Sequence, residues 1–120
     1  GSSKEDFEED LKKLTAECIQ ENNLELTDKD KEDLEKKMCP SSEVAKCMLT
    51  CVEQKAGWMD GVQFSLNKTK EAMGKVFTDN EATLKMMEQL VEFCHKKVGH
   101  VDEECGAGYR VCECMVSHTG

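Results

Sequence analysis

The sequence predicts an all-α protein, a compact six-helix domain stapled by disulfides around an apolar cavity. Three observations lead to this prediction: eight cysteines fall within 120 residues, six segments repeat apolar residues at helical spacing, and we find no convincing strand pattern. A chain of this length buries a modest core, and helices this short are not stable alone in water. Disulfide cross-links are therefore expected to stabilise the domain, and a cross-linked domain can tolerate an internal cavity.

The composition indicates a highly charged surface. Charged residues make up 34% of the chain, and the net charge is -9 from 16 basic and 25 acidic residues. An acidic chain without a Lys/Arg cluster interleaved with aromatic residues is not expected to bind nucleic acid. No apolar run approaches the roughly 20 residues of a membrane span. We expect residues 1–3 to be a cloning remnant or N-terminal tail, residues 4–116 a single domain, and residues 117–120 a short C-terminal tail.

The cysteine content indicates an oxidising, extracellular environment, in which cysteines at this density form disulfides. Zinc binding is the alternative, because cytosolic thiols at this density often bind metal. Zinc sites use paired Cys-x-x-Cys or similar motifs, whereas the close pairs here are Cys47/Cys51 and Cys112/Cys114, and the three histidines show no ligand spacing. We therefore expect disulfides, no metal and no cofactor.

The first three helices follow from apolar stripes and from signals at their ends. The expected ranges are Lys4–Asn22, a second helix from a cap at Thr27 to about Met38-Cys39, and a third helix over Glu43–Lys55. Thr27 precedes acidic residues that suit the start of a helix, and Pro40 disfavours helical geometry at Cys39. Ser41 or Ser42 is expected to cap the third helix, which stops at the next glycine.

The second half of the chain is expected to contain a loop and three helices. Trp58–Leu66 is the least charged stretch and carries an Asp-Gly turn signal, so it is expected to be an ordered loop against the body. Asn67-Lys68-Thr69 matches an N-glycosylation acceptor, although its position favours Asn67 or Thr69 as the cap of the fourth helix. The expected helices cover about Thr69–Phe77, a span from a cap at Thr78 or Asp79 to Val98, and about Asp102–Val116.

The third helix organises the predicted domain. Cys47 and Cys51 lie four residues apart, on one face of this helix and one turn from each other. Their side chains point out in parallel, whereas a disulfide needs Cβ atoms that face each other across roughly 4 Å. Each cysteine must therefore bond a different segment, so disulfides are expected to link the third helix to two other segments.

Six of the cysteines follow a recognisable spacing. Positions 18, 47, 51, 94, 105 and 114 are separated by 28, 3, 42, 10 and 8 residues. This pattern resembles the six-cysteine signature of insect odorant-binding proteins, the pheromone-binding and general odorant-binding family, over about Phe7 to Val116. The three-residue and eight-residue gaps are its most specific parts. The resemblance implies an all-α shell around an apolar pocket, with the interlocked pairs Cys18–Cys51, Cys47–Cys105 and Cys94–Cys114.

Two cysteines are additional to that signature. Their positions make Cys39–Cys112 the natural fourth pair, which would join the second helix to the sixth. Cys112 and Cys114 lie about 200° apart around a helix, so they face different neighbours. The alternative is that Cys39 and Cys112 are two free, buried thiols.

The candidate ligand-binding residues come from inward helix faces and from the loop. Methionine is prominent among them, and its adaptable shape suits several apolar ligands, although ordinary core filling explains any single one equally well. Tyr109 is the candidate hydrogen-bond donor, with a half-exposed surface position as the alternative. Five methionines are placed on or near inward faces: Met48, Met73, Met86, Met87 and Met115. The expected pocket residues are Leu14, Met48, Val52, Trp58, Phe64, Met73, Phe77, Met87, Leu90, Val91, Tyr109 and Met115.

The residues and the resemblance together predict a secreted, non-enzymatic carrier of small apolar or semi-polar ligands, of odorant or pheromone type. Catalysis is not expected, because the chain has no Gly-x-Ser-x-Gly motif and no His-Asp pair with a calcium loop. The alternative is a disulfide-locked secreted protein-interaction module without a ligand pocket, and a weaker alternative is a metal-binding thiol protein. The expected partners are a small hydrophobic ligand and, as a candidate, a membrane receptor, with the protein a monomer or weak homodimer.

Overall fold

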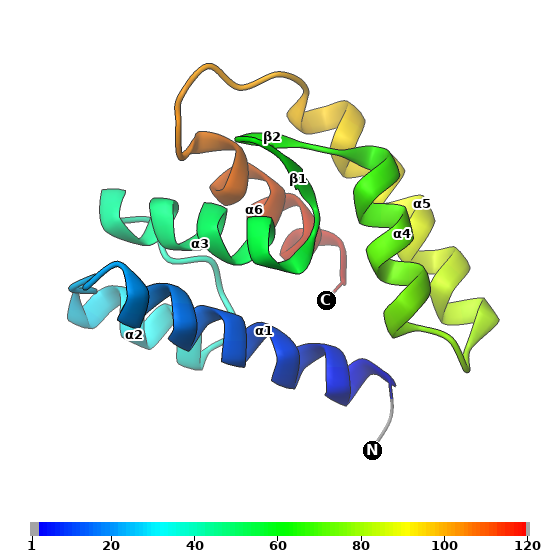
Figure 1. The fold of residues 1–120 in the computed structure, drawn as a ribbon, viewed down its shortest axis with the longest axis horizontal. Coiled ribbons are helices and arrows are strands. Elements are labelled where there is room, and N and C mark those ends of the chain that lie inside the picture. Colours follow the sequence, from blue (N-terminus) through cyan, green and yellow to red (C-terminus); the bar gives the residue numbers. More distant parts are fainter. Residues whose placement is uncertain (1–2, 120) are drawn as a thin grey trace.

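The computed structural model describes residues 3–119, and this part of the chain forms six α-helices and one two-stranded sheet (Figure 1). Residues 1–2 of the expected N-terminal remnant and residue 120 of the expected tail lie outside the described residues. No helix within residues 3–119 has the length and apolar character needed to span a membrane. The elements in chain order are α1 (Ser3–Glu21), α2 (Asp28–Glu35), α3 (Glu43–Ala56), β1 (Met59–Asp60), β2 (Gln63–Phe64), α4 (Leu66–Val76), α5 (Glu81–Val98) and α6 (Gly106–Thr119).

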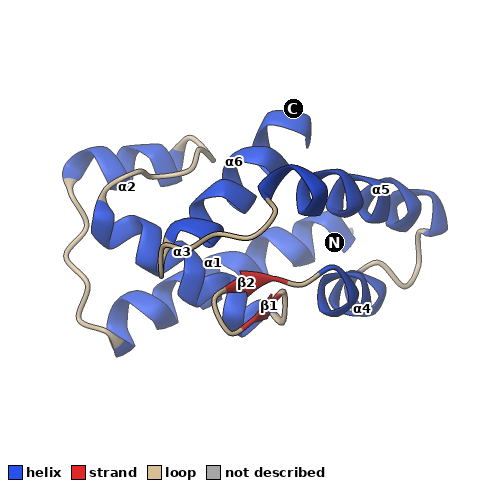
Figure 2. Cartoon of the chain, turned by 90° about the horizontal axis from the view of Figure 1, so that it is seen from above, coloured by secondary structure: helices blue, strands red, loops and turns tan. Residues whose placement is uncertain are grey.

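Helix α6 lies at the centre of the domain. It packs against α3 and α5, while α1 packs along α3 and α4 packs against α5 (Figure 1). Seen from above, α2 lies at the end of the domain remote from α4 and α5 (Figure 2). The predicted all-α, six-helix fold class is therefore confirmed.

Four disulfides connect these helices, and they are the three pairs implied by the resemblance together with the expected fourth pair, Cys39–Cys112. Helix α3 is tied to α1 by one bond and to the segment before α6 by another, as its two parallel cysteines require. All eight cysteines are bonded, so the free-thiol alternative for Cys39 and Cys112 is wrong and no thiolate remains for zinc. Within residues 3–119, no group of three or more His, Cys, Asp or Glu side chains is placed to hold a metal ion. The pairs are Cys18–Cys51, Cys39–Cys112, Cys47–Cys105 and Cys94–Cys114.

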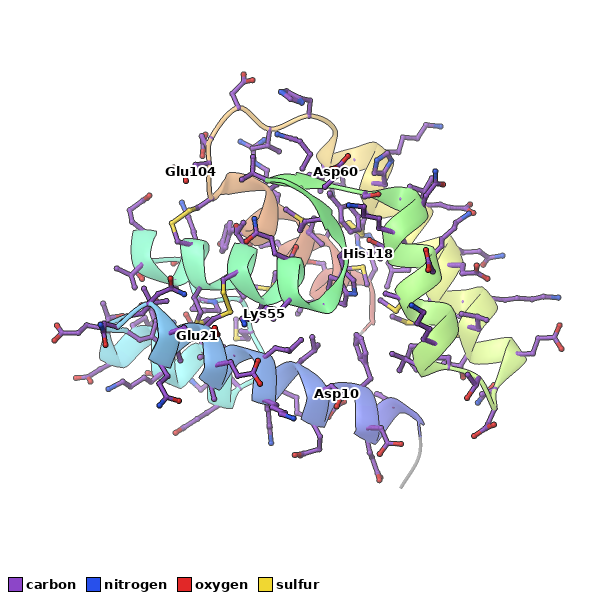
Figure 3. The ribbon with its side chains drawn as sticks, in the orientation of Figure 1. Asp10, Glu21, Lys55, Asp60, Glu104 and His118 are labelled. Atoms are coloured by element: carbon purple, nitrogen blue, oxygen red, sulfur yellow. A yellow bond between two sulfur atoms is a disulfide. The ribbon has the colours of Figure 1, made fainter. Side chains whose placement is uncertain are left out.

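The junction of α1 and α3 shows how this covalent framework relates to the surface charges. Near the Cys18–Cys51 bond, Lys55 points toward Glu21 (Figure 3), and Lys55 Nζ lies 2.7 Å from Glu21 Oε2. An ion pair this open to solvent contributes at most about 1 kcal/mol. The disulfide, rather than the ion pair, is therefore the main link between the two helices at this point.

Helix α2 ends at Glu35, three residues before the predicted end at Met38. Lys37 adopts a left-handed conformation, with φ of 59°. Its backbone N–H donates to Leu34 O at 3.1 Å, and Met38 N–H donates to Asp33 O at 2.8 Å. This is a Schellman motif, which usually places glycine at the left-handed position. Lysine in that position gave no sequence signal for the end of the helix.

Helix α6 begins at Gly106 rather than at Asp102, and it continues to Thr119, three residues beyond the predicted end. The later start has a physical cause in the preceding segment. The Gln63 side chain donates to Val101 O at 2.7 Å and accepts from Val101 N–H at 3.0 Å. These two bonds hold the segment before α6 against β2 and delay the start of the helix.

The helix caps are partly as predicted. Ser42, one of the two candidates, caps α3. Helix α4 is capped by Ser65, so the prediction that Asn67 or Thr69 forms this cap is wrong, and the segment Asn67-Lys68-Thr69 lies inside the helix. Helix α5 is capped by Asn80 in place of Thr78 or Asp79. Where several neighbouring residues can each cap a helix, the sequence does not select among them.

The stretch predicted as a strandless loop forms a short β-hairpin. Met59 pairs with Phe64, and Asp60 pairs with Gln63. Gly61, at the turn, has φ of 62°, a conformation that favours glycine. Strands of two residues are too short to show an alternating pattern, which explains why the sequence did not indicate them.

Asp30 connects the start of α2 to the start of α3. Its side chain is 2% exposed and forms a capping box with Thr27. It also accepts hydrogen bonds from the backbone N–H of Ser42 at 3.3 Å and from the Ser42 hydroxyl. Burial alone would raise the pKa of the Asp30 carboxyl, but the hydrogen bonds from Ser42 and Thr27 outweigh burial, and the pKa is lowered.

We expect D30N to lower the free energy of unfolding by about 2 kcal/mol at neutral pH, because an amide NH2 replaces an acceptor oxygen in this buried network. The lowered pKa means that this contribution is present above the ordinary Asp value of about 3.9 and is lost as pH falls through the folded-state pKa. Denaturant unfolding of both proteins at neutral and at acidic pH tests this. If D30N lowered the free energy of unfolding by the same amount at acidic pH as at neutral pH, an ionised Asp30 would be contradicted.

Candidate ligand-binding site

The buried apolar side chains form two clusters. The large cluster is built from the hairpin region, α4, α5 and α6, and the small cluster lies between α1, α3 and α6. The buried members of the large cluster are Trp58, Met59, Phe64, Met73, Phe77, Val91, Cys94, Val101, Ala107, Val111, Cys114 and Met115. The buried members of the small cluster are Cys18, Met48, Leu49 and Val52.

The structure divides the twelve predicted pocket residues between these clusters. Eight belong to the large cluster: Trp58, Phe64, Met73, Phe77, Met87, Leu90, Val91 and Met115. Four belong to the small cluster: Leu14, Met48, Val52 and Tyr109. Leu11 of α1 packs against both clusters. The sequence pattern assigned these residues to inward helix faces and to the loop, but it could not show that they form two separate clusters.

Three aromatic rings connect α1 to the large cluster. The ring of Phe7 stacks on Trp58 with centroids 6.0 Å apart, and it lies 5.6 Å from the ring of Phe77. These contacts lie where the N-terminal part of α1 approaches α4 (Figure 1). Phe7 was not assigned to the site from the sequence. Its presence among only six aromatic residues was the available signal.

Two predicted side chains are arranged differently from the expectation. Met86 was placed on an inward face but is 68% exposed, so that placement is wrong. Tyr109 is half-buried beside the small cluster, with Lys46 Nζ 5.2 Å from its ring centroid. Burial, followed by the charge and hydrogen bond of Glu113, raises the pKa of the Tyr109 hydroxyl. The Glu113 carboxyl therefore lies near this hydroxyl, on the same helix.

Glu53 of α3 is a buried acid that sequence reasoning missed. Its side chain is 3% exposed, and its Oε1 atom has no hydrogen-bond partner within the described part of the chain. Burial raises the pKa of the Glu53 carboxyl well above its ordinary value. The available signal was a charged residue on the apolar face that also carries Leu49, Val52 and Ala56.

Two hollows on the described surface lie away from the predicted residues. One, of about 750 Å³, is lined by α2 and the end of α1, including Ile19, Leu24, Leu26 and Leu34. The other, of about 280 Å³, lies between α5 and α6 and is lined by Lys97, Arg110 and neighbouring residues. None of the twelve predicted pocket residues lines either hollow.

The fold and these clusters define a small all-α protein in which interlocked disulfides surround an apolar interior. Residues 2–118 match the PBP/GOBP family, and the chain belongs to this family of insect odorant-binding proteins, which are non-enzymatic carriers. Its fold is similar to that of the odorant-binding protein dmelOBP28a from Drosophila melanogaster, with a TM-score of 0.70 and 22% sequence identity. That match covers 97% of this chain and 93% of the other. A comparison with curated protein sequences gives no significant match.

Proposed function

We propose that this protein is an extracellular carrier that binds a small apolar or semi-polar molecule, of odorant or pheromone type, within the large cluster. Membership of the PBP/GOBP family is the observation that carries this proposal. Four disulfides support an oxidising, extracellular environment, where such bonds persist. The membrane receptor and the monomeric or weakly dimeric state remain predictions.

The large cluster is the better site because its side chains can adapt. It contains Met59, Met73, Met87 and Met115, whose flexible side chains can repack around ligands of different shape. The large cluster contains one disulfide, Cys94–Cys114, whereas the small cluster contains all four cysteines of the Cys18–Cys51 and Cys39–Cys112 bonds. Two covalent links across a small group of side chains leave it little freedom to open. A ligand is therefore expected to enter the large cluster.

The expected affinity follows from the apolar area that a ligand loses to the pocket. At roughly 25 cal/mol per Å², a ligand of ten or more carbons gains enough to bind in the micromolar range after the costs of association. An apolar site with few polar groups selects by shape and size. We therefore expect several related ligands to bind with similar affinities.

Trp58 provides an internal reporter for this binding. It is the single tryptophan of the chain and lies in the large cluster. We expect an apolar naphthylamine probe to bind with about micromolar affinity and to quench Trp58 emission by energy transfer, because both groups share one cluster. Titration of the probe, followed by displacement with long-chain alcohols and esters, measures this.

The matched control is W58F, which keeps an aromatic ring but removes the energy donor. The probe is expected to bind this variant, with its own emission enhanced and without energy transfer. If the wild-type protein binds neither the probe nor any ligand of the panel, the carrier function fails. In that case the protein-interaction module becomes the better description.

A further inference from the structure

Glu53 is a polar side chain in the interior that the fold does not explain. Its carboxyl takes no part in the helix caps or in the ion pairs of the described residues, and its Oε1 atom has no partner there. Leaving a buried polar group unpaired costs about 1–3 kcal/mol. A ligand that supplies a hydrogen-bonding partner would recover part of this cost on binding.

The position of Glu53 places it where the two clusters meet along α3. One turn before it, Leu49 belongs to the small cluster, and one turn after it, Ala56 packs against the large cluster. The backbone oxygen of Glu53 accepts a hydrogen bond at 3.0 Å from the N–H of Trp58, a member of the large cluster. Glu53 therefore lies where the two clusters meet along α3, next to the proposed ligand site.

The surroundings of Glu53 determine which ligand chemistry suits it. Burial, without a neighbouring cation among the described residues, favours the neutral carboxyl, which carries one O–H donor and retains acceptor capacity. A neutral carboxyl can donate to the oxygen of a carbonyl or ester, and it can both donate to and accept from an alcohol. A pure hydrocarbon would leave it unpaired.

We propose that Glu53 is the hydrogen-bonding anchor of the ligand site and selects apolar ligands that carry one alcohol, carbonyl or ester oxygen. This proposal rests on the proposed carrier function, because it assigns a ligand class to the same site. Tyr109 was the donor expected from the sequence, but it packs against the small cluster rather than the large one, which leaves Glu53 as the anchor.

The test compares 1-decanol with 1-chlorodecane, which has the same chain but a poor hydrogen-bonding group. Displacement of the naphthylamine probe gives both affinities for the wild-type protein, for E53M and for E53Q. Methionine matches the length of glutamate without its polar atoms, whereas glutamine keeps donors and an acceptor without an ionisable group. Each variant is first checked for thermal unfolding, in which E53M is expected to be at least as stable as the wild type.

For each protein, the affinity for 1-decanol is divided by the affinity for 1-chlorodecane. This ratio is expected to be about threefold to tenfold larger in the wild type than in E53M, which is the usual value of one hydrogen bond. In E53Q most of this preference should remain. Equal preferences in the wild type and E53M would overturn the anchor while leaving the carrier function intact, since both proteins would still bind the probe. A far stronger preference for 1-decylamine, lost in E53Q, would overturn the proposed ligand class, because it would indicate an ionised Glu53 that pairs with a cation.

Discussion

Replacement of Cys39 and Cys112 by serine is expected to lower the free energy of unfolding by about 4 kcal/mol. The bond joins residues 73 apart in the sequence, the largest separation among the four disulfides, so its removal releases the most conformational entropy in the unfolded chain. Both cysteines are only partly buried, and serine at these positions leaves little empty core volume. Guanidinium unfolding of C39S/C112S and of the wild type measures the difference.

The same variant is expected to loosen α2 in particular. This helix packs on the rest of the domain through Leu34, through the Asp30 network and through an exposed ion pair between Lys37 and Glu8. Amide hydrogen exchange should therefore rise in α2 while the α5 amides stay protected. A loss of stability below about 1 kcal/mol would contradict the account of this bond as a principal support.

Alanine at Gly108 is expected to cost about 3 kcal/mol or more, because it would force α3 and α6 apart. A Cβ atom at this position would lie 2.4 Å from Thr50 Oγ1, 2.6 Å from Thr50 N and 2.7 Å from Thr50 Cα. Two of these atoms belong to the backbone, which cannot move aside as a flexible side chain can. The Thr50 hydroxyl also donates to Cys105 O at 3.2 Å, and the Cys47–Cys105 bond lies beside it. Both links resist the separation that the alanine would need.

Gly74 of α4 provides the matched control, because the same substitution there should have the opposite sign. Apart from its own chain neighbours and helix backbone, a Cβ placed on Gly74 would meet no atom within 4 Å. Alanine in an open helix interior is favoured over glycine by about 0.5–1 kcal/mol, so G74A should be more stable than the wild type. Thermal unfolding of G74A and G108A compares the two positions. If G74A and G108A changed the stability equally, the close packing of α3 on α6 would be contradicted.

The disulfide framework was predictable because the order and spacing of cysteines are written directly in the sequence. Helix geometry alone indicated that Cys47 and Cys51 bond different partners. The resemblance to a known cysteine signature then indicated which cysteines these partners are. Helices were predictable for the same kind of reason, since their apolar stripes extend over several turns. Features that depend on one or two residues were not, such as the two-residue strands and the left-handed Lys37 at the end of α2.

The candidate site was predictable only as a set of inward faces. A helical pattern shows that Met48 and Met73 are buried, but it does not show that they lie in different clusters. That division depends on how α1, α3 and α6 cross, which is a property of tertiary packing. Glu53 was missed for a related reason, because a single glutamate on an amphipathic helix is usually solvated, and here the packing of neighbouring helices buries it.

The placement of the ligand in the large cluster is the central claim, and the methionine methyl groups test it most directly. With 13C-labelled methionine methyls, the seven signals report on different parts of the protein. Met59, Met73, Met87 and Met115 lie in the large cluster, Met48 lies in the small one, and Met38 and Met86 are exposed.

On addition of 1-decanol to saturation, we expect the signals of the four large-cluster methionines to shift. Met48 of the small cluster should change little, and the exposed Met38 and Met86 should not change. Shifts confined to Met38 and Met86 would indicate association with the surface, and a dominant shift at Met48 would place the ligand in the small cluster. Either result would contradict the site proposed for this carrier.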